Sequence, residues 1–324
     1  MAHYELLGWK KTDWDFVGKR YIAFGFSACL LVVGAIAMVR IGTGKAKLAI
    51  DFSGGQAIQA GIEGPVDLDK VRGAFSARGL SDVQVQQATV QKGQRLLIKL
   101  RGAEMSSTTA VGTGGEMVRG ILVGALPGAT VVIEGVQAVG PAVGRRLQEQ
   151  AMWAVIWAIV LIMVYIWIRF EYRFGLAAAV ATLHDVIAVL GIMWLIGADF
   201  SLLIVTALLT LAGYSLTDTV VVYDRIRENL RLHPAESFEV NVNRSINEVL
   251  SRTLVTSLMV LLPLISLLIY GSPVTFDFSL SLSFGVIVGT YSSWYVASPL
   301  IVEWENYRRR RAAEAAANRM AGRQ

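Results

Sequence analysis

The chain has 324 residues, of which 54% are hydrophobic and only 17% are charged, and its formal net charge at pH 7 is +5. Soluble domains average roughly 45–50% apolar and about 25% charged residues, so the composition excludes an ordinary soluble protein and indicates an integral membrane protein. Basic loops on one side of a membrane explain the positive charge better than a nucleic-acid partner does.

Cysteine and histidine usage excludes further classes of protein. The single cysteine, Cys29, has no partner for an intramolecular disulfide. The three histidines, His3, His184 and His233, are too scattered to suggest a metal site, and no CxxC motif is present.

Six apolar segments are long enough to cross a bilayer as helices, for which about 20 residues suffice. They lie near residues 21–41, 150–168, 175–197, 201–223, 254–271 and 279–301. The first run exceeds the roughly 7–15 apolar residues of a signal peptide, so we expect it to be retained as the first span. The other five spans are expected within residues 148–302, with a charged loop at about 224–252.

Basic residues indicate the orientation of these spans. Clusters of Lys and Arg occur in residues 1–20, 169–173, 224–252 and 303–324, whereas the short loops at 197–199 and 271–275 carry none. The positive-inside rule then places both terminal tails in the cytoplasm and residues 42–147 on the outer side. The arginine run at 308–311 is most simply a topology anchor beside anionic headgroups.

Residues 42–147 have an ordinary globular composition and predict an α+β domain between the first and second spans. Its elements are expected as two extended pieces within 48–61 broken by Gly54-Gly55, a helix at 67–80, strands at 82–90 and 94–100, a helix at 115–126 and a strand at 129–135. This order suggests a small ferredoxin-like layer. No nucleophile–base pair or phosphate loop is evident, so we expect a partner-binding or structural domain.

An acid lies inside the apolar run from Leu202 to Tyr223. Asp218 would cost at least about 2.5–3.5 kcal/mol on membrane insertion scales. Helical spacing places it on one side with Ser215, Thr219 and Val222. Apolar surroundings favour a neutral carboxyl group and a nearby cation favours a charged one, so Asp218 could take up and release a proton. A permanently neutral, hydrogen-bonded acid, or a charge that reaches the interface, is the alternative.

Two further motifs carry charged or titratable groups. Arg252, just before the apolar part of the fifth span, is the candidate cation near Asp218, although alone it would be interpreted as an interface anchor. His184-Asp185 lies midway along the third span. Adjacent residues point to different faces of a helix, so we do not expect a simple His–Asp dyad. Asp185 should face the bundle interior, in a proton relay or in a structural hydrogen bond.

Glycine motifs predict structural roles. Residues 51–55, Asp-Phe-Ser-Gly-Gly, predict a fixed turn between membrane and domain in which Asp51 caps backbone N–H groups, and not a phosphate loop. Gly213 predicts the close approach of a neighbouring helix. Gly285 and Gly289 form a GxxxG pair that predicts close helix packing and not a substrate site.

Together these motifs resemble the SecF family of protein-export membrane proteins, within the resistance–nodulation–division superfamily. The resemblance covers essentially the whole chain and is carried by residues 51–55, the His184-Asp185 pair, GYSLTDTVVVYDRIREN at 213–229 and SINEVLSRT at 245–253. One residue departs from the expected pattern. Thr217 stands where the family is expected to have Asn before the membrane acid, and it keeps a hydrogen-bonding group but no amide.

The resemblance implies a non-enzymatic, six-span half-transporter of the bacterial inner membrane that pairs with SecD and docks to the SecYEG channel. YajC, YidC, the translocating preprotein and the lipid bilayer are further implied partners. The proton gradient would help to complete preprotein translocation, with protons as the coupling ion and no cofactor or metal. Asp218 would carry the proton and Arg252 would modulate it. A second tier of site residues comprises His184, Asp185, Ser215, Thr217 and Thr219.

Two other functions compete with this hypothesis. A stand-alone proton-coupled exporter on the same superfamily fold would need a substrate pocket and larger, usually paired external domains. A non-transporting scaffold of the translocase would tolerate neutralisation of Asp218.

Overall fold

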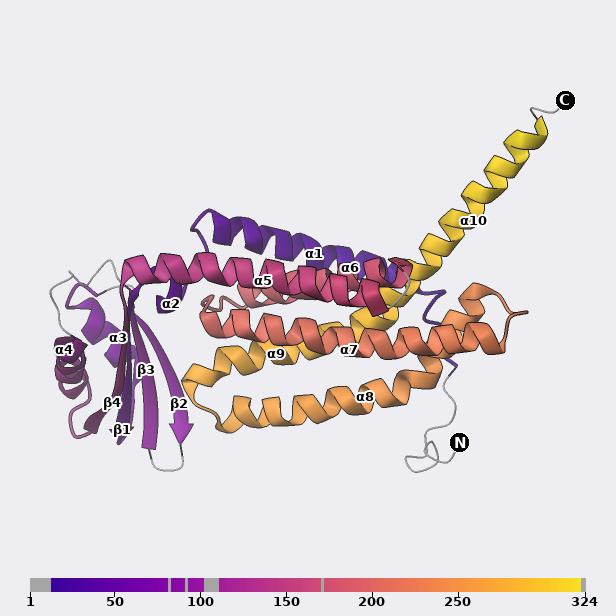
Figure 1. Cartoon of the computed structure of the whole chain (residues 1–324). Coiled ribbons are helices and arrows are strands. Elements are labelled where there is room, and N and C mark those ends of the chain that lie inside the picture. Colours follow the sequence, from indigo (N-terminus) through magenta and orange to yellow (C-terminus); the bar gives the residue numbers. More distant parts are fainter. Residues whose placement is uncertain (1–12, 81–82, 91–92, 102–110, 170–171, 322–324) are drawn as a thin grey trace.

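The computed structural model describes residues 13–80, 83–90, 93–101, 111–169 and 172–321. It consists of a bundle of long helices with a small α+β domain at one end, and the last helix extends away from the other end (Figure 1). Of the N-terminal tail predicted at 1–20, residues 1–12 lie outside the described part. The described start of the chain is bound at the end of the bundle opposite the domain, where the backbone of Trp14 bonds to the side chains of Asn243 and Asn247.

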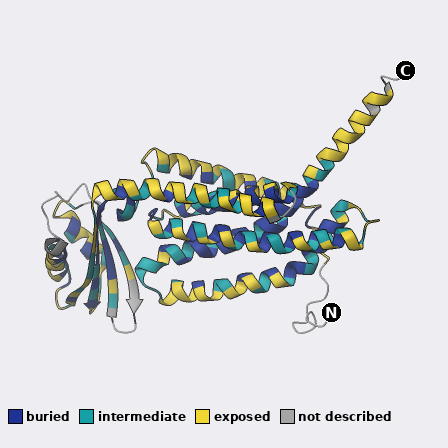
Figure 2. Ribbon diagram, in the orientation of Figure 1, coloured by how far each residue is buried: buried dark blue, intermediate teal, exposed yellow. Residues whose placement is uncertain are grey.

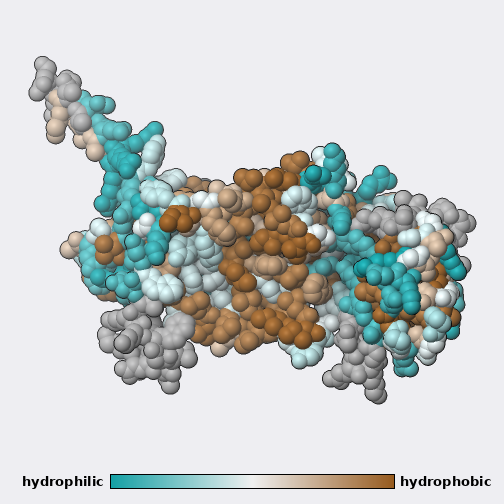
Figure 3. Space-filling model, turned by 180° about the vertical axis from the view of Figure 1, so that it is seen from behind, coloured by the Kyte–Doolittle hydropathy of each residue, from teal (hydrophilic) through white to brown (hydrophobic). Residues whose placement is uncertain are grey.

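Six helical stretches in the described residues are long and apolar enough to cross a membrane, in agreement with the six-span prediction. They are α1 (Arg20–Gly42), α5 (Pro141–Arg169), α6 (Tyr172–Leu195), α7 (Leu202–Leu232), α8 (Phe238–Tyr270) and α9 (Pro273–Ser292), the last of which continues through the π-helical turn η1 (Ser293–Ala297) into α10 (Ser298–Ala321). A band of apolar residues crosses the bundle between the more polar domain and α10 (Figure 3). Such a belt is covered by lipid, so the protein is a multi-pass membrane protein.

Exposure is distributed unevenly among these helices (Figure 2). The helices α1, α5 and α8 expose much of their apolar surface, whereas α6 and α9 are buried along most of their length. In α6 the buried positions fall on nearly all sides of the helix, and they include His184 and Asp185. The interior of the bundle is therefore built around α6, α7 and α9.

Several predicted boundaries are wrong because helices continue into charged sequence. The segment 224–252, predicted as a loop, is almost entirely helical, and only residues 233–237 connect α7 to α8. Interhelical ion pairs support these extensions, such as that between Arg225 and Glu248 at 2.6 Å. The second span likewise begins at Pro141 instead of 148, inside the range predicted for the domain, and the tail at 303–324 is helical as far as Ala321.

Glycines allow α1 and α6 to approach closely. Gly34 of α1 lies against the backbone of α6 at Ile187, and a Cβ atom at Gly34 would overlap the Ile187 carbonyl oxygen. A Cβ atom at Gly191 would lie 2.7 Å from the backbone nitrogen of Gly34. This contact was not predicted from the sequence.

The GxxxG pair of α9 packs against α7, as predicted. A Cβ atom at Gly285 would lie 2.9 Å from the Leu211 side chain, and one at Gly289 would lie 3.0 Å from Cβ of Ser215. The prediction for Gly213 is wrong within this chain, because Gly213 is exposed and nothing lies within 4 Å of its Cβ position. The residue is on the side of α7 that faces away from α9.

The α+β domain has the order β1 (Gly55–Glu63), α3 (Leu68–Ser76), β2 (Gln84–Val90), β3 (Gly93–Arg101), α4 (Val111–Ala125), β4 (Thr130–Val139). Its sheet has the strand order β2-β3-β1-β4, and every neighbouring pair is antiparallel. This is the predicted ferredoxin-like arrangement. Apolar residues of α3 and α4 pack on the sheet around Phe75, Ile98 and Leu122. Asp67 caps α3, and its hydrogen bond from the Lys70 N–H lowers the pKa of the Asp67 carboxyl.

The junction between membrane and domain differs from the prediction in one element. Residues 50–53, predicted as an extended piece, form a short helix, α2 (Ile50–Ser53). This turn allows Oδ2 of Asp51 to accept a hydrogen bond at 3.0 Å from the N–H of Leu202, the first residue of α7, which is the capping role predicted for Asp51. Gly54 and Gly55 have positive φ angles of 75° and 138°, which favour glycine.

The glycine contact between α1 and α6 gives a testable prediction. Gly34→Ala should lower the melting temperature of the purified protein, because overpacking costs typically about 1–3 kcal/mol. The new methyl group would overlap the backbone of Ile187, which cannot relieve the overlap by changing a side-chain rotamer. The matched control is Gly25→Ala, on the same helix, where nothing lies within 4 Å. Equal melting temperatures for the two variants would contradict the close α1–α6 packing.

Candidate functional site

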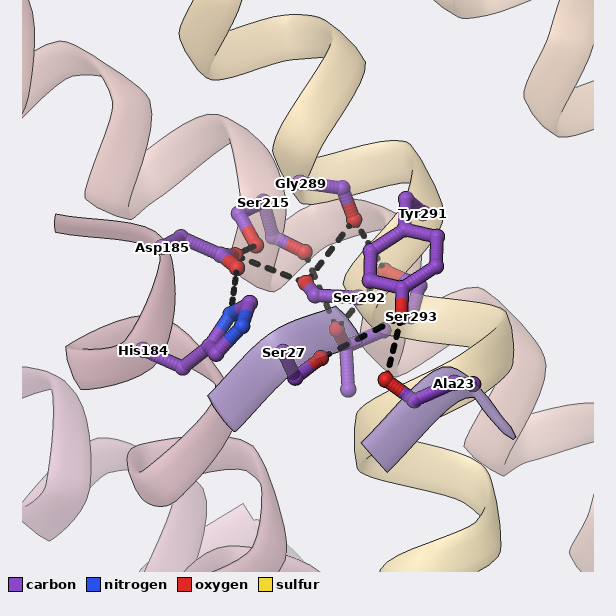
Figure 4. Close-up of polar contacts among 10 residues, drawn as sticks. Ala23, Ser27, His184, Asp185, Ser215, Gly289, Tyr291, Ser292 and Ser293 are labelled. Atoms are coloured by element: carbon purple, nitrogen blue, oxygen red, sulfur yellow. Dashed lines mark hydrogen bonds and ion pairs between the residues drawn. The ribbon is translucent and has the colours of Figure 1, made fainter. Parts of the chain in front are cut away.

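The polar centre of the bundle is the Asp185 carboxylate on α6, which is 0% exposed. Its Oδ2 accepts hydrogen bonds from the hydroxyl of Ser215 on α7 and from that of Ser292 at the end of α9, the latter at 2.8 Å. Its Oδ1 lies 2.9 Å from Nδ1 of His184. One carboxylate therefore joins three helices (Figure 4), and the prediction that Asp185 faces the interior is confirmed.

His184 and Asp185 contact each other, and the prediction that they would not form a direct pair is wrong. Side chains of adjacent residues leave a helix about 100° apart, but α6 is buried on nearly all sides, so both directions lead into the protein interior. The imidazole lies against the carboxylate (Figure 4). Its Nε2 atom is buried and has no hydrogen-bond partner among the described residues.

A second hydroxyl contact joins α7 to the π-helical turn η1. Oγ1 of Thr219 lies 3.0 Å from Oγ of Ser293, which also donates to the carbonyl of Gly289. Ser215 and Thr219, one turn apart on α7, thus contact polar groups of α6 and η1. Because π-helical turns inside α-helices are frequent at functional sites, the position of η1 beside this cluster supports a functional role for the region.

Asp218 lies three residues beyond Ser215 and is only 5% exposed. The predicted common side of α7 is confirmed, because Ser215, Asp218, Thr219 and Val222 are all buried. The Oδ2 atom of Asp218 is buried without a hydrogen-bond partner among the described residues. The side chains of Thr256 and Ser257 on α8 lie beside the carboxyl group. Asp218 therefore has one oxygen that can still accept a hydrogen bond or a proton, whereas both oxygens of Asp185 are hydrogen-bonded.

Arg252 and Thr217 occupy more peripheral positions than Asp218. Arg252 on α8 is exposed, and it is near enough to interact electrostatically with Asp218, although no ion pair joins these two described residues. Thr217 is exposed and donates its hydroxyl to the carbonyl of Gly213 in its own helix at 3.1 Å. The departure from the expected Asn thus lies on the outer side of α7, away from the buried Asp218 carboxyl group.

Besides Thr256, three hydroxyl groups near Asp218 were not identified from the sequence. The hydroxyl of Tyr214 donates to Oγ of Ser257 at 3.1 Å, and Oγ of Ser257 lies 2.6 Å from Oγ1 of Thr290. They connect α7, α8 and α9 beside the acid. A Ser or Thr in an apolar span is a weak signal, because such side chains commonly bond to their own helix carbonyls.

Comparison with known proteins identifies the family. The family model described as "Protein export membrane protein SecD/SecF, C-terminal" matches residues 126–307. The protein translocase subunit SecF of Thermodesulfovibrio yellowstonii is 41% identical over 300 residues, which cover 92% of this chain and 96% of that protein. The chain belongs to the SecF family. Its SecF relative from Magnetococcus marinus is 40% identical over 94% of this chain and 96% of that protein.

Solved structures agree with this assignment to the SecF family. The crystal structure of SecDF from Thermus thermophilus, a translocon-associated membrane protein, matches with a TM-score of 0.74 and 36% identity over 91% of this chain. A crystal structure of SecDF in a super-membrane-facing form matches with a TM-score of 0.66 and 36% identity over 95% of this chain. This chain spans only 39% and 40% of those longer chains.

The three-helix joint at Asp185 gives the prediction for this site. Ser292→Ala should destabilise the protein by about 1–3 kcal/mol, because it removes a donor from a buried acceptor. Thermal unfolding of the purified protein measures the change. Ser283→Ala is the control on the same helix, since the buried Ser283 hydroxyl donates to the carbonyl of Ser279 in its own helix and bonds to no other helix in the described part of the chain. The prediction fails if both variants unfold at the same temperature.

Proposed function

We propose that the chain is the SecF-type subunit of a protein translocase and that it acts with SecD to use the proton gradient in preprotein translocation. Its family membership supports the translocase role, and the SecDF match supports pairing with SecD. In this proposal the assembly acts beside the SecYEG channel, with YajC and YidC as further partners. The coupling ion is the proton, and no cofactor takes part.

The observation that carries the proposal is the incompletely bonded carboxyl of Asp218 inside a membrane helix. Burial of an unpaired charge is costly, so burial weakens the preference of Asp218 for the ionised form. Approach of the Arg252 guanidinium would favour the ionised form. A small change in the distance between α7 and α8 can therefore load or release a proton.

The available energy limits how this coupling works. One proton that falls through about 100 mV supplies about 2.3 kcal/mol. Shifting a two-state equilibrium from 1:99 to 99:1 requires about 5.5 kcal/mol. One proton per cycle therefore suffices only if the two conformations are closely balanced or if a pH gradient adds to the potential.

We place both termini in the cytoplasm and the α+β domain in the periplasm of a bacterial inner membrane. Basic residues support this orientation, since they gather at the end of the bundle opposite the domain. Examples are Arg173, Arg225 and Arg244, which form ion pairs there with Glu305, Glu248 and Glu236.

Replacement of the membrane acid tests the proposal. Asp218→Asn should assemble with SecD but lose the part of translocation that depends on the proton gradient. The reason is that an amide side chain does not bind and release a proton near neutral pH. The measurement is preprotein translocation into SecF-depleted inverted membrane vesicles complemented with each variant, with and without a proton gradient. Asp224→Asn is the matched control, because Asp224 is an exposed acid on the same helix.

The same assay separates the competing functions. Full gradient-dependent translocation with Asp218→Asn would contradict proton coupling at Asp218 and would favour a scaffold of the translocase. A protein that restored no translocation in its wild-type form, but extruded small molecules under a gradient, would be a stand-alone exporter.

A further inference from the structure

A buried basic side chain connects the α+β domain to the membrane helices. The side chain of Lys99, on β3, is only 12% exposed. Its Nζ lies 3.7 Å from Oδ2 of Asp199 and 3.8 Å from Oδ2 of Asp277, whose side chains are 4% and 11% exposed. One ammonium group is therefore shared by two carboxylates that are largely shielded from solvent.

The two carboxylates lie at the beginnings of two spanning helices. Asp199 lies three residues before Leu202, where α7 begins, and Asp277 lies in the second turn of α9. The helix α7 carries Asp218, and α9 ends at Ser292 in the polar cluster. Each acidic partner of Lys99 is thus fixed to a helix that reaches the candidate proton site.

A separate set of contacts holds the domain at the point where the chain enters it. Leu48 forms a parallel bridge with Phe200, and Asp51 caps α7 at Leu202. These contacts lie within a few residues of the chain connection, so they can act as a pivot. The Lys99 side of its contact lies on the sheet itself, whereas its partner Asp199 directly precedes Phe200 of this pivot.

The interface between the domain and the bundle beside Lys99 is polar, and its side chains do not fill it completely. Nε2 of Gln84 on β2 donates to Oδ1 of Asp199 at 3.0 Å. A hollow of about 290 Å³ lies between β2 and residues 197–199. Among the described residues, apolar packing at this edge consists of a small cluster in which Val274 of α9 contacts buried residues of the junction and sheet. Separation at this edge would therefore break ion pairs and expose little apolar surface.

We propose that Lys99 is a positioning residue that couples the α+β domain to α7 and α9. While Lys99 bridges Asp199 and Asp277, the domain is held against the bundle. When α7 shifts relative to α9, the bridge opens and the domain pivots. The inference rests on the proposed function, in which a change of protonation at Asp218 displaces α7.

The bridge can switch because its two acids repel each other when the cation is gone. Asp199 and Asp277 are close enough to interact electrostatically in this structure. Withdrawal of Lys99 removes the cation that the two carboxylates share, and like charges repel each other at short range. The position of the domain and the relative position of the two helices are therefore linked in both directions.

The test combines a distance measurement with the translocation assay on the protein assembled with its SecD partner. Spin labels at Glu63 on β1 and Ile196 after α6, both exposed positions, report the domain–bundle distance in a Cys29→Ala background. Lys99→Met should broaden this distance distribution. It should also lower gradient-dependent translocation about tenfold or more, since loss of one partner from a buried ion pair is strongly destabilising.

Arg95→Met is the matched control. Arg95 lies four residues earlier on β3, and its ion pair with Glu134 is more exposed and stays within the sheet. The charge-swapped pair Lys99→Asp with Asp199→Lys should restore a narrow distribution and most of the rate, because it rebuilds one cation between two acids. If Lys99→Met does not assemble, Asp277→Asn should give a smaller broadening in the same direction.

Distinct outcomes overturn the inference. It fails if Lys99→Met behaves like Arg95→Met in both readouts, or if the distance distribution broadens while gradient-dependent translocation is unchanged. Failure of the proposed function is recognised separately, by full gradient-dependent translocation of Asp218→Asn.

Discussion

The structure depends on the constraint that polar groups inside the apolar belt must find their partners within the protein. Asp185 is the point where this constraint is met, since its carboxylate is bonded by groups from α6, α7 and α9. Loss of any of these contacts would leave the buried carboxylate with fewer hydrogen bonds, which is costly away from water. The three helices are therefore held in one register, and Gly289 is needed so that α9 can approach Ser215 closely enough.

Next to this fixed joint, Asp218 is suited to a different role. Both acids are buried, and Ser215, one of the residues that bonds Asp185, lies one turn from Asp218 on α7. Both carboxylate oxygens of Asp185 are hydrogen-bonded, whereas Oδ2 of Asp218 has no hydrogen-bond partner among the described residues. Arg252 is near enough to interact electrostatically with Asp218, but no ion pair joins these two described residues. Asp185, whose oxygens are both hydrogen-bonded, stabilises the bundle. Asp218, which has an oxygen without a partner and a cation nearby, can change its protonation.

Much of the fold followed from the sequence because its signals are local. Apolar runs gave the six spans, and alternation around 82–100 gave the hairpin of β2 and β3. What the sequence did not reveal depends on contacts between distant segments. Three contacts could be found only by knowing which segments pack together and which of their faces are buried. They are the pairing of Gly34 with Gly191, the bridge from Lys99, and the direct contact of His184 with Asp185.

The central claim is that Asp218 changes its protonation while Asp185 acts as a structural joint. Infrared difference spectroscopy of the bilayer-reconstituted assembly, titrated over pH, tests this most directly because it detects the C=O stretch of a protonated carboxyl group. The account predicts a titrating carboxyl band that disappears in Asp218→Asn and persists in Ser292→Ala. A titration unchanged by Asp218→Asn, or no titrating buried carboxyl at all, would contradict it.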